Sequence, residues 1–478
     1  MPGNLPSRLA AESLGCAEFR RDHAVRYAYV AGSMYKAISS EALVVRMGRA
    51  GLLGFFGTGG QRRHEVESAI KTIQAQLGPD QPYGINLIAE LGDPQREDIV
   101  VDLALAHGVR RIEAAGFVRM TPSLVRYRVS HLLRQPDGAV TAPHLVLAKV
   151  SRPEVATAFL HPPPPDIVNE LVAAGKVTSE SAALARHLPM ADDICVEADS
   201  GGHTDQRSAL ALLPAMVALR DRTVQRLGYR KRVRIGLAGG LGSPAAVAAA
   251  FVMGADFVLT GSINQCTVEA GTSDAAKDLL AQAEVEDTTM APAGDMFEIG
   301  AKVQVLKRGL FFPARANHLY ELYQRHGSIA ELDPKTADQI QRRYFRRTFE
   351  DVWQETSAFF QCHAPAELAA AKENPKRKLA LIFKWYFVQS MRLAIQGALE
   401  QRADFQIQCG PAMGAFNQVV RGTPLEDWRH RHVDHIAELL MTGAAQVLRR
   451  FLDHACRADQ RPVRLGGCPV PFPREPDR

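Results

Sequence analysis

The sequence predicts an α/β fold, a (β/α)8 TIM barrel with a helical insert, followed by a C-terminal helical domain. Eight short apolar runs alternate with longer stretches of helical periodicity through residue 260, and the strand signal fades from about residue 310 onward. Strands that alternate with helices pair in parallel, and eight such units fit a closed barrel better than an open sheet.

Each expected strand is a short apolar run bounded by turn or polar residues. Helical periodicity is clear between them over 40–51 and 96–108, and the second of these segments ends at Gly108, as a helix C-cap does. The eight expected strands are 27–31, 52–56, 83–88, 109–113, 144–150, 194–198, 233–237 and 256–260.

Two regions depart from this alternation and define the expected domains. Residues 151–193 carry a proline-rich start and two short helical patterns between the fifth and sixth strands, a length typical of a lid. Residues 311–478 have helical patterns, and 336–355 place aromatic and aliphatic side chains on one helical stripe. We therefore expect a barrel over 1–310, with an insert or lid at 151–193, and a helical domain over 311–478.

Composition excludes several classes of protein. The chain has 478 residues, a net charge of +5, 46% hydrophobic and 23% charged residues, which is typical of a soluble globular protein. Seven cysteines form no CxxC pair or zinc-type cluster, so we expect no metal and a reducing, cytoplasmic location. Basic residues are dispersed, which argues against nucleic acid as a partner. The uncharged stretch 235–255 is broken by glycines and Pro244, so we expect no membrane span.

The candidate site lies where the strands end, because barrel active sites form at the carboxyl ends of the strands. Glycine-rich turns follow the seventh and eighth strands, where barrels commonly bind phosphate through backbone N–H groups. The alternative is that these glycines only make tight turns. A dinucleotide fingerprint does not fit, because its GxGxxG spacing is absent. The strand-end segments are AGSM (31–34), Asn86, Lys149, EADSGGH (197–203), AGGLGS (238–243) and TGSI (260–263).

The segment ICVEADSGGHT places His203 directly after Gly201 and Gly202. The glycines would let the backbone approach a ligand closely. Taken alone, such a histidine more often forms a hydrogen bond to a neighbouring acid in the loop, here Asp199 or Asp205.

Several longer phrases resemble the PfaD family of flavin-dependent, trans-acting enoyl reductases of polyketide and polyunsaturated fatty-acid synthases. The resemblance covers about residues 27–450 and extends more distantly to nitronate monooxygenases and flavin-type bacterial enoyl reductases. The phrases are YVAGSMYKAISS, YGINLI, AKVSRPEVA, VEADSGGHTDQR, LAGGLGSP, LTGSINQCTVEAGTS, MFEIGAKVQVLKRG and CGPAMGAFNQVVRG.

The resemblance implies FMN at the carboxyl face of the barrel, reduction by NADPH or NADH, and an enoyl thioester on an acyl carrier protein as substrate. It assigns His203 and Lys149 to catalysis, Lys149 also as a cation beside the flavin ring that stabilises negative charge on the reduced flavin. Without the resemblance, Lys149 is better interpreted as a strand-end surface lysine paired with a neighbouring acid. The other residues it assigns to FMN are Ala31, Gly32, Ser33, Met34, Asn86, Gly201, Gly202, Gly239, Gly240, Gly261 and Ser262.

His203 has two open roles in the implied reaction, as hydrogen-bond donor to the thioester oxygen or as proton donor to the α-carbon. Two other functions remain as alternatives: a nitronate oxidase that uses oxygen, and a non-catalytic flavoprotein subunit of a synthase. Cys266 follows the eighth strand, as the nucleophile of another barrel enzyme class would, but a buried thiol is the better interpretation because no histidine lies near it in sequence.

Acidic carrier proteins would need a basic surface near the site. Residues 342–347 and 376–384 supply two candidate basic segments, each beside acidic residues that can neutralise it. Acyl chain length and branching, the choice between NADPH and NADH, stereochemistry and a possible homodimer stay open.

Overall fold

The computed structural model describes residues 9–89 and 94–459. Eight parallel strands close into a barrel in which neighbours in sequence are neighbours in space. Each overlaps one of the expected runs, with the largest shift at the fourth strand, which lies two residues later than expected. The barrel strands are β1 (Tyr29–Ala31), β2 (Leu53–Phe56), β3 (Gly84–Ile88), β4 (Arg111–Ala115), β7 (Leu145–Val150), β8 (Asp193–Glu197), β10 (Arg234–Ala238) and β11 (Phe257–Thr260).

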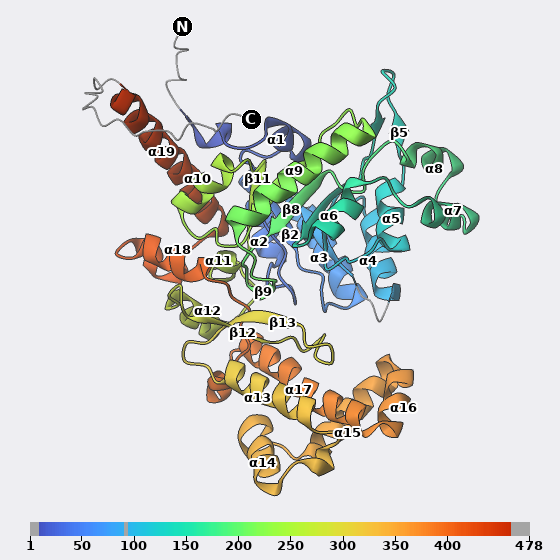
Figure 1. Cartoon of the computed structure of the whole chain (residues 1–478), viewed down its shortest axis with the longest axis vertical. Helices are drawn as coiled ribbons and strands as arrows, with labels where there is room; N and C mark the ends of the chain where they lie inside the picture. The colour runs from blue at the N-terminus through green and yellow to red at the C-terminus, as the bar shows by residue number, and fades with distance from the viewer. Residues whose placement is uncertain (1–8, 90–93, 460–478) are drawn as a thin grey trace, which may run out of the picture.

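Helices pack around this barrel and bury their apolar faces on it (Figure 1). The segments expected at 40–51 and 96–108 form α2 and α4, and α10 begins at Pro244, where the uncharged stretch was expected to turn. The surrounding helices are α1 (Ala17–His23), α2 (Glu41–Arg49), α3 (Arg63–Gln76), α4 (Pro94–Ala106), α5 (Pro122–Val129), α6 (Pro153–Leu160), α9 (Ala209–Leu227), α10 (Pro244–Val252) and α19 (Val433–Asp459).

The eighth barrel helix comes from the far end of the chain. A barrel helix after the eighth strand should lie between the seventh and the first helices, and α19 packs against α10 and α2 in that position. Residues 261–432 are therefore inserted between β11 and its helix. The short helices α11 (Ser262–Gln265), α12 (Asp274–Ala281) and α18 (Ala412–Val420) lie within this insertion, on the barrel side.

The rest of the insertion forms a helical domain with its own apolar core, below the barrel in Figure 1. Its core residues come from 291–387, whereas those of 393–445 belong to the core of the barrel. The predicted fold class is confirmed. The two hydrophobic cores divide the chain differently from the expected domains, because the helical core begins before the expected boundary at 311 and part of the expected helical domain, 311–478, packs on the barrel core. Helices of the barrel and helices of the helical domain have the same periodicity, so the sequence pattern does not reveal which of the two cores a helix joins.

The helical domain is joined to the barrel by a three-stranded antiparallel sheet. Its strands are β12 (Thr288–Pro292), β13 (Lys302–Leu306) and β9 (Gly202–His203), the last of which follows β8 of the barrel. The helices are α13 (Phe312–Arg325), α14 (Pro334–Gln339), the π-helical segment η3 (Ile340–Phe345), α15 (Phe349–His363), α16 (Pro365–Glu373) and α17 (Pro375–Gln396). Short 3-10 turns are η1 (Ala11–Ser13), η2 (Ile329–Glu331), η4 (Leu399–Asp404), η5 (Pro424–Glu426) and η6 (Trp428–His430).

The stripe expected over 336–355 is divided among separate helices. Arg346 has a positive φ of 54° and ends η3, and Thr348 caps the N-terminus of α15 by accepting a hydrogen bond from the Asp351 N–H. Phe345 and Val352 nevertheless lie in one core, because the break turns both helices toward α17.

The segment expected to form a lid packs along the outside of the barrel. Its first helix, α6, packs against α9 and β7 as an ordinary barrel helix. The next two, α7 (Pro165–Ala173) and α8 (Ser179–Ala185), pack against α5, and α8 also contacts β5 (Leu133–Arg134), which pairs with β6 (Val140–Thr141). The helices of 151–193 therefore lie on the flank of the barrel, and a role of this segment as a lid stays a prediction.

Candidate functional site

Two acids and a lysine lie together at the carboxyl end of the barrel. Glu113, Lys149 and Glu197 come from the neighbouring strands β4, β7 and β8. The Lys149 ammonium lies 2.9 Å from a carboxylate oxygen of Glu197. Burial alone would lower the pKa of Lys149, but the charges of Glu197 and Glu113 outweigh burial and raise it. Lys149 therefore supplies a fixed positive charge at this end of the barrel.

Glu113 is the member of this cluster that the sequence analysis missed. Its side chain is fully buried, one oxygen accepts a hydrogen bond of 2.9 Å from the Ser33 N–H, and the other has no partner among the described residues. Burial raises the pKa of the Glu113 carboxyl, although the Lys149 charge opposes this. A buried carboxyl with one unbonded oxygen can hold a proton, or can accept a hydrogen bond from a bound ligand.

The first strand-end loop, which contains Ala31, Gly32, Ser33 and Met34, lies directly against this cluster. Ala31 is buried, and a Cβ on Gly32 would lie 2.6 Å from the Leu259 side chain and 3.2 Å from Glu113 Oε1. The Met34 N–H donates to the Ser39 hydroxyl. Two later residues of the loop, Lys36 and Ala37, have positive φ values of 58° and 54°. Consecutive non-glycine residues in this region store strain, which concentrates at functional sites.

Asn86 supports the neighbouring loop from the end of β3. Its side-chain oxygen accepts hydrogen bonds of 3.0 Å from the Thr58 N–H and 2.8 Å from the Thr58 hydroxyl. The side chain is almost fully buried. Asn86 therefore holds the loop after β2 in place through Thr58.

The two glycine turns after β10 and β11 lie side by side, because these strands pair with Ala238 opposite Leu259. Gly240 has a φ of 72°, and a Cβ on either Gly240 or Gly261 would meet nothing within 4 Å. The N–H groups of both donate no hydrogen bond to any residue that the structure describes. These turns present free backbone donors beside open space, as phosphate binding requires.

Other glycines of these turns serve the packing of the chain itself. A Cβ on Gly239 would lie 2.7 Å from the Asp199 carbonyl oxygen, and one on Gly201 would lie 2.8 Å from both the Gly410 nitrogen and the Ser262 hydroxyl. Ser262 accepts a hydrogen bond of 3.0 Å from the Gly410 N–H. The side of Gly201 that a Cβ would occupy therefore packs closely against residues 409–410 of the chain itself.

His203 lies where the barrel meets the helical domain. It pairs with Val303 in the small sheet, after Gly202, whose φ is 79°. Its Nε2 lies 3.2 Å from a carboxylate oxygen of Asp295, and the side chains are 44% and 63% exposed. Burial alone would lower the pKa of His203, but the hydrogen bond and the charge of Asp295 raise it.

The partner of His203 is neither of the acids that sequence proximity suggested. Asp205 forms an ion pair with Arg152 at 3.0 Å, and Asp199 accepts a hydrogen bond of 3.0 Å from the Gln304 side chain. Asp295 is 92 positions away in sequence. Only the folded insertion brings the two side chains together.

Cys266 is fully buried, and its thiol lies 3.5 Å from the Arg431 guanidinium. Burial raises the pKa of Cys266 to about 12, against the effect of Arg431. A thiol in this state is a poor nucleophile, so the geometry favours a packing role.

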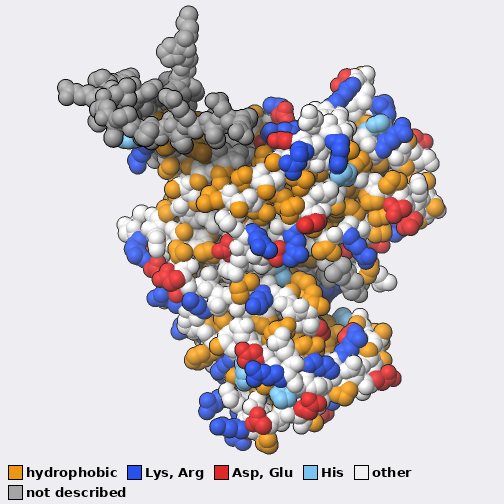
Figure 2. Space-filling model, viewed as in Figure 1, with side chains coloured by type: hydrophobic (Ala, Val, Ile, Leu, Met, Phe, Trp, Pro, Cys, Tyr) orange, Lys and Arg blue, Asp and Glu red, His pale blue; other side chains and the backbone are white. Residues whose placement is uncertain are grey.

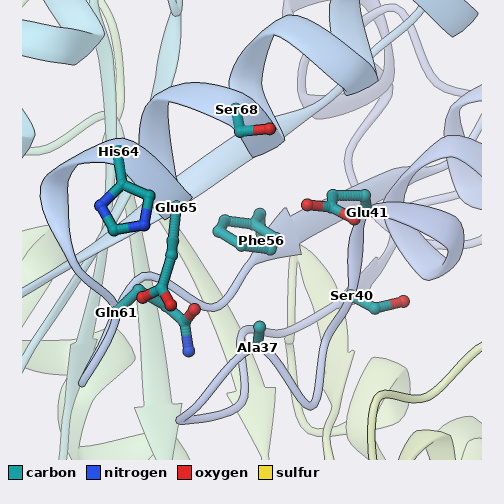
Figure 3. Close-up of a pocket in the computed structure, with 8 residues that line it drawn as sticks. All are labelled: Ala37, Ser40, Glu41, Phe56, Gln61, His64, Glu65 and Ser68. Atoms are coloured by element: carbon teal, nitrogen blue, oxygen red, sulfur yellow. The ribbon is translucent and has the colours of Figure 1, made fainter.

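A pocket of about 310 Å³ lies away from the acid and lysine cluster, beside the carboxyl end of β2, where α2 and α3 begin. Figure 3 shows Phe56 at its centre, with Glu41 on one side and His64 and Glu65 on the other. None of the residues assigned to the flavin lines this pocket, so it is a feature of the barrel rim.

Half of the basic side chains in the two segments of the helical domain pair with carboxylates. Arg342 pairs with Asp338, Arg347 pairs with Glu355, and Arg377 pairs with Glu367. Lys384 lies 3.1 Å from Glu298. Figure 2 shows positive and negative side chains interspersed over this domain. The arrangement favours a solvated, internally paired surface over a basic docking patch.

Comparison with known proteins places the chain in a family. The nitronate monooxygenase family model matches residues 19–308, and the model of the inserted helical domain of [acyl-carrier-protein] S-malonyltransferase matches residues 326–405. The chain belongs to the nitronate monooxygenase family. The second match lies in the insertion between β11 and α19, and most of it falls in the helical domain.

Close relatives of this nitronate monooxygenase family member include a polyketide biosynthesis protein and a subunit of a polyunsaturated fatty acid synthase. The chain is 53% identical to the polyketide biosynthesis protein PksE of Bacillus subtilis over 93% of its own length and 58% of that protein. It is 43% identical to a polyunsaturated fatty acid synthase protein of Thraustochytrium over 86% of its length and 28% of that protein. The chain thus spans just over half, or less, of the length of these two relatives.

A solved structure matches nearly the whole chain. The enoyl reductase domain of MlnA, from the macrolactin cluster of Bacillus amyloliquefaciens, is 44% identical with a TM-score of 0.90, covering 93% of this chain and 99% of that domain. The expected resemblance to the PfaD family is confirmed by these relatives. Separately, no helix in the described residues is both long and apolar enough to cross a membrane.

Proposed function

We propose that the protein is a trans-acting enoyl reductase that uses FMN and NADPH, or alternatively NADH. Its substrate is an α,β-unsaturated acyl thioester on an acyl carrier protein in polyketide or polyunsaturated fatty-acid biosynthesis. The observation that carries the proposal is the near-complete match to the MlnA enoyl reductase domain. The helical domain adds support, because the family model that matches it describes an insert of an acyl-carrier-protein transferase.

The residues at the carboxyl face fit FMN. The free N–H groups of Gly240 and Gly261 would bind its phosphate, with Gly239 and Ser262 shaping the two turns. Lys149 would lie toward the ring, where a fixed cation stabilises negative charge. When bound, FMN would accept hydride from the nicotinamide and deliver it to the β-carbon of the thioester.

His203 would act on the substrate rather than on the cofactor. Because Asp295 raises its pKa, a larger share of His203 is protonated near neutral pH than of an ordinary histidine. A protonated ring can donate a hydrogen bond to the thioester oxygen as charge develops there, or a proton to the α-carbon. Its half-exposed position between barrel and helical domain suits a substrate that arrives on another protein.

The family also includes enzymes that oxidise nitronates, and this is the alternative activity. A helical domain with its own core is superfluous for a small nitroalkane, which favours a protein-bound substrate. A non-catalytic role in a synthase would not require Lys149 and His203 at the strand ends.

The experiment is stopped-flow reduction of the flavin-loaded protein by NADPH and by NADH, followed by mixing of the reduced protein with an enoyl thioester or with oxygen. In a separate arm, the oxidised protein is mixed with a nitronate. We expect rapid nicotinamide reduction and reoxidation by the enoyl thioester faster than by air. Faster reoxidation by oxygen than by the enoyl thioester, or reduction of the oxidised flavin by a nitronate faster than by either nicotinamide, would overturn the proposal, as would a protein that cannot be loaded with FMN.

A further inference from the structure

The opposite end of the barrel carries a second pocket. It has a volume of about 500 Å³ and lies at the amino ends of the strands, away from Lys149 and the glycine turns. Its walls come from the end of α1, the loop between α3 and β3, and the start of β4. The charged residues that line it are Arg21, Asp22, Asp80, Arg110 and Arg111.

Arg111 is a buried cation that faces this pocket. It is only 7% exposed, and its guanidinium donates to His23 Nδ1 at 3.3 Å and to the His23 carbonyl oxygen at 3.0 Å. Among the described residues, no carboxylate lies within ion-pair distance of it. Burial and then the neighbouring charge of Arg110 lower the pKa of Arg111 to about 10.

The acids nearest to this arginine are already neutralised by other cations. His23 Nε2 lies 2.7 Å from Asp193, and burial lowers the pKa of His23, so the neutral ring donates to Asp193 and accepts from Arg111. Asp193 also binds the Arg234 guanidinium at 2.5 Å. Asp22 pairs with Lys231 and with Arg234.

The charge at the pocket is therefore unbalanced. Arg234 and Lys231 take up the two carboxylates Asp193 and Asp22, which leaves Arg111 without one. Arg110 adds a further positive charge on the pocket wall. A buried guanidinium without a counter-charge is costly, and an oxyanion is its usual complement because it accepts two N–H bonds in parallel.

We propose that this pocket binds a small oxyanion, a phosphate ester or a di- or tricarboxylate, through Arg111 and Arg110. Asp80 also lines the pocket and is exposed. Its carboxylate would repel an anion large enough to fill the whole pocket, which favours a small one. The site is separate from the proposed flavin site, so neither proposal depends on the other.

Isothermal titration of the flavin-loaded protein with pyrophosphate and, separately, with citrate at constant ionic strength tests this. Arg110→Glu should weaken binding of the preferred anion at least about 10-fold, the loss expected for one charge-assisted contact. Arg110 is exposed and outside the buried network, so this variant should fold. The preferred probe identifies the ligand class.

Two controls make the outcome decisive. Arg325→Glu changes an exposed arginine of the helical domain and should leave anion binding unchanged. Gly261→Ala alters the proposed flavin turn and should also leave it unchanged. Absence of saturable binding to the wild-type protein, equal binding by Arg110→Glu, or a loss caused only by Gly261→Ala would each overturn the inference.

Discussion

Replacing Asp295 with Asn should uncouple His203 from the helical domain. The two side chains are 3.2 Å apart, and Asp295 supplies the hydrogen bond and charge that raise the pKa of His203. Asparagine keeps the shape and can still accept a hydrogen bond, but carries no charge. The pKa of His203 should therefore fall in Asp295→Asn, and the protonated fraction at neutral pH with it.

The energetic size of this coupling is limited by solvent, because the side chains are 44% and 63% exposed. Exposed ion pairs contribute about 0.2–1 kcal/mol, and salt screens them. A histidine whose pKa is raised by folding stabilises the folded state fully below its unfolded pKa, near 6.5, and this contribution is lost as pH rises through the folded value. Asp295→Asn should therefore destabilise the protein at pH 6 and have little effect at pH 9.

The assay combines two measurements. Titration of the His203 ring signal by NMR, assigned with His203→Gln, gives the direction of the pKa change. A double-mutant cycle of Asp295→Asn and His203→Gln, by urea unfolding at pH 6 and pH 9, gives the coupling free energy. Asp338→Asn, which removes another exposed acid of the helical domain, is the matched control. An unchanged His203 pKa, or equal coupling at both pH values, would refute the reasoning.

Three further predictions concern the cofactor, the acid and the surface. Gly261→Ala should lower FMN affinity at least about 10-fold, measured by flavin fluorescence, because its methyl group would enter open space beside the free N–H groups, whereas Gly78→Ala should not. His203→Ala should slow reoxidation by enoyl thioester about 100-fold and alter nicotinamide-dependent reduction much less; equal losses would show that it only positions the flavin. Replacing Arg342 and Arg347 with Glu should change KM for carrier-bound substrate less than about threefold, because both are already paired. A large increase in KM for carrier-bound substrate, with none for a small thioester, would show instead that these arginines belong to a docking surface.

The barrel was predictable because of how its strands are buried. A strand covered on both faces is a nearly continuous apolar run, as 145–150 and 257–260 are, and the glycine turns mark where such runs end. This pattern is local, so sequence reasoning can detect it.

The position of α19 was not predictable in the same way. Its apolar face would suit either core, and its place between α10 and α2 depends on a return of the chain after a long insertion. The place of 151–193 on the flank of the barrel has a similar cause, because length between strands does not indicate whether a segment covers the end or the flank of a barrel.

The candidate site shows the same division. Lys149, His203 and the glycine turns lie at strand ends and are accessible to sequence reasoning, whereas Glu113 looks only like the end of an apolar strand. An acid as the last residue of such a run, next to the carboxyl face of a barrel, is the signal that could have found it. Asp295 carries no local signal.

The most direct test of the proposed activity is intact-mass spectrometry of a carrier protein bearing an α,β-unsaturated acyl thioester, incubated with the FMN-loaded protein and NADPH. The account predicts that the acyl group gains two hydrogen atoms and that His203→Ala greatly slows the conversion. An acyl group of unchanged mass, in a preparation whose flavin is reduced by NADPH and reoxidised by oxygen, would contradict it.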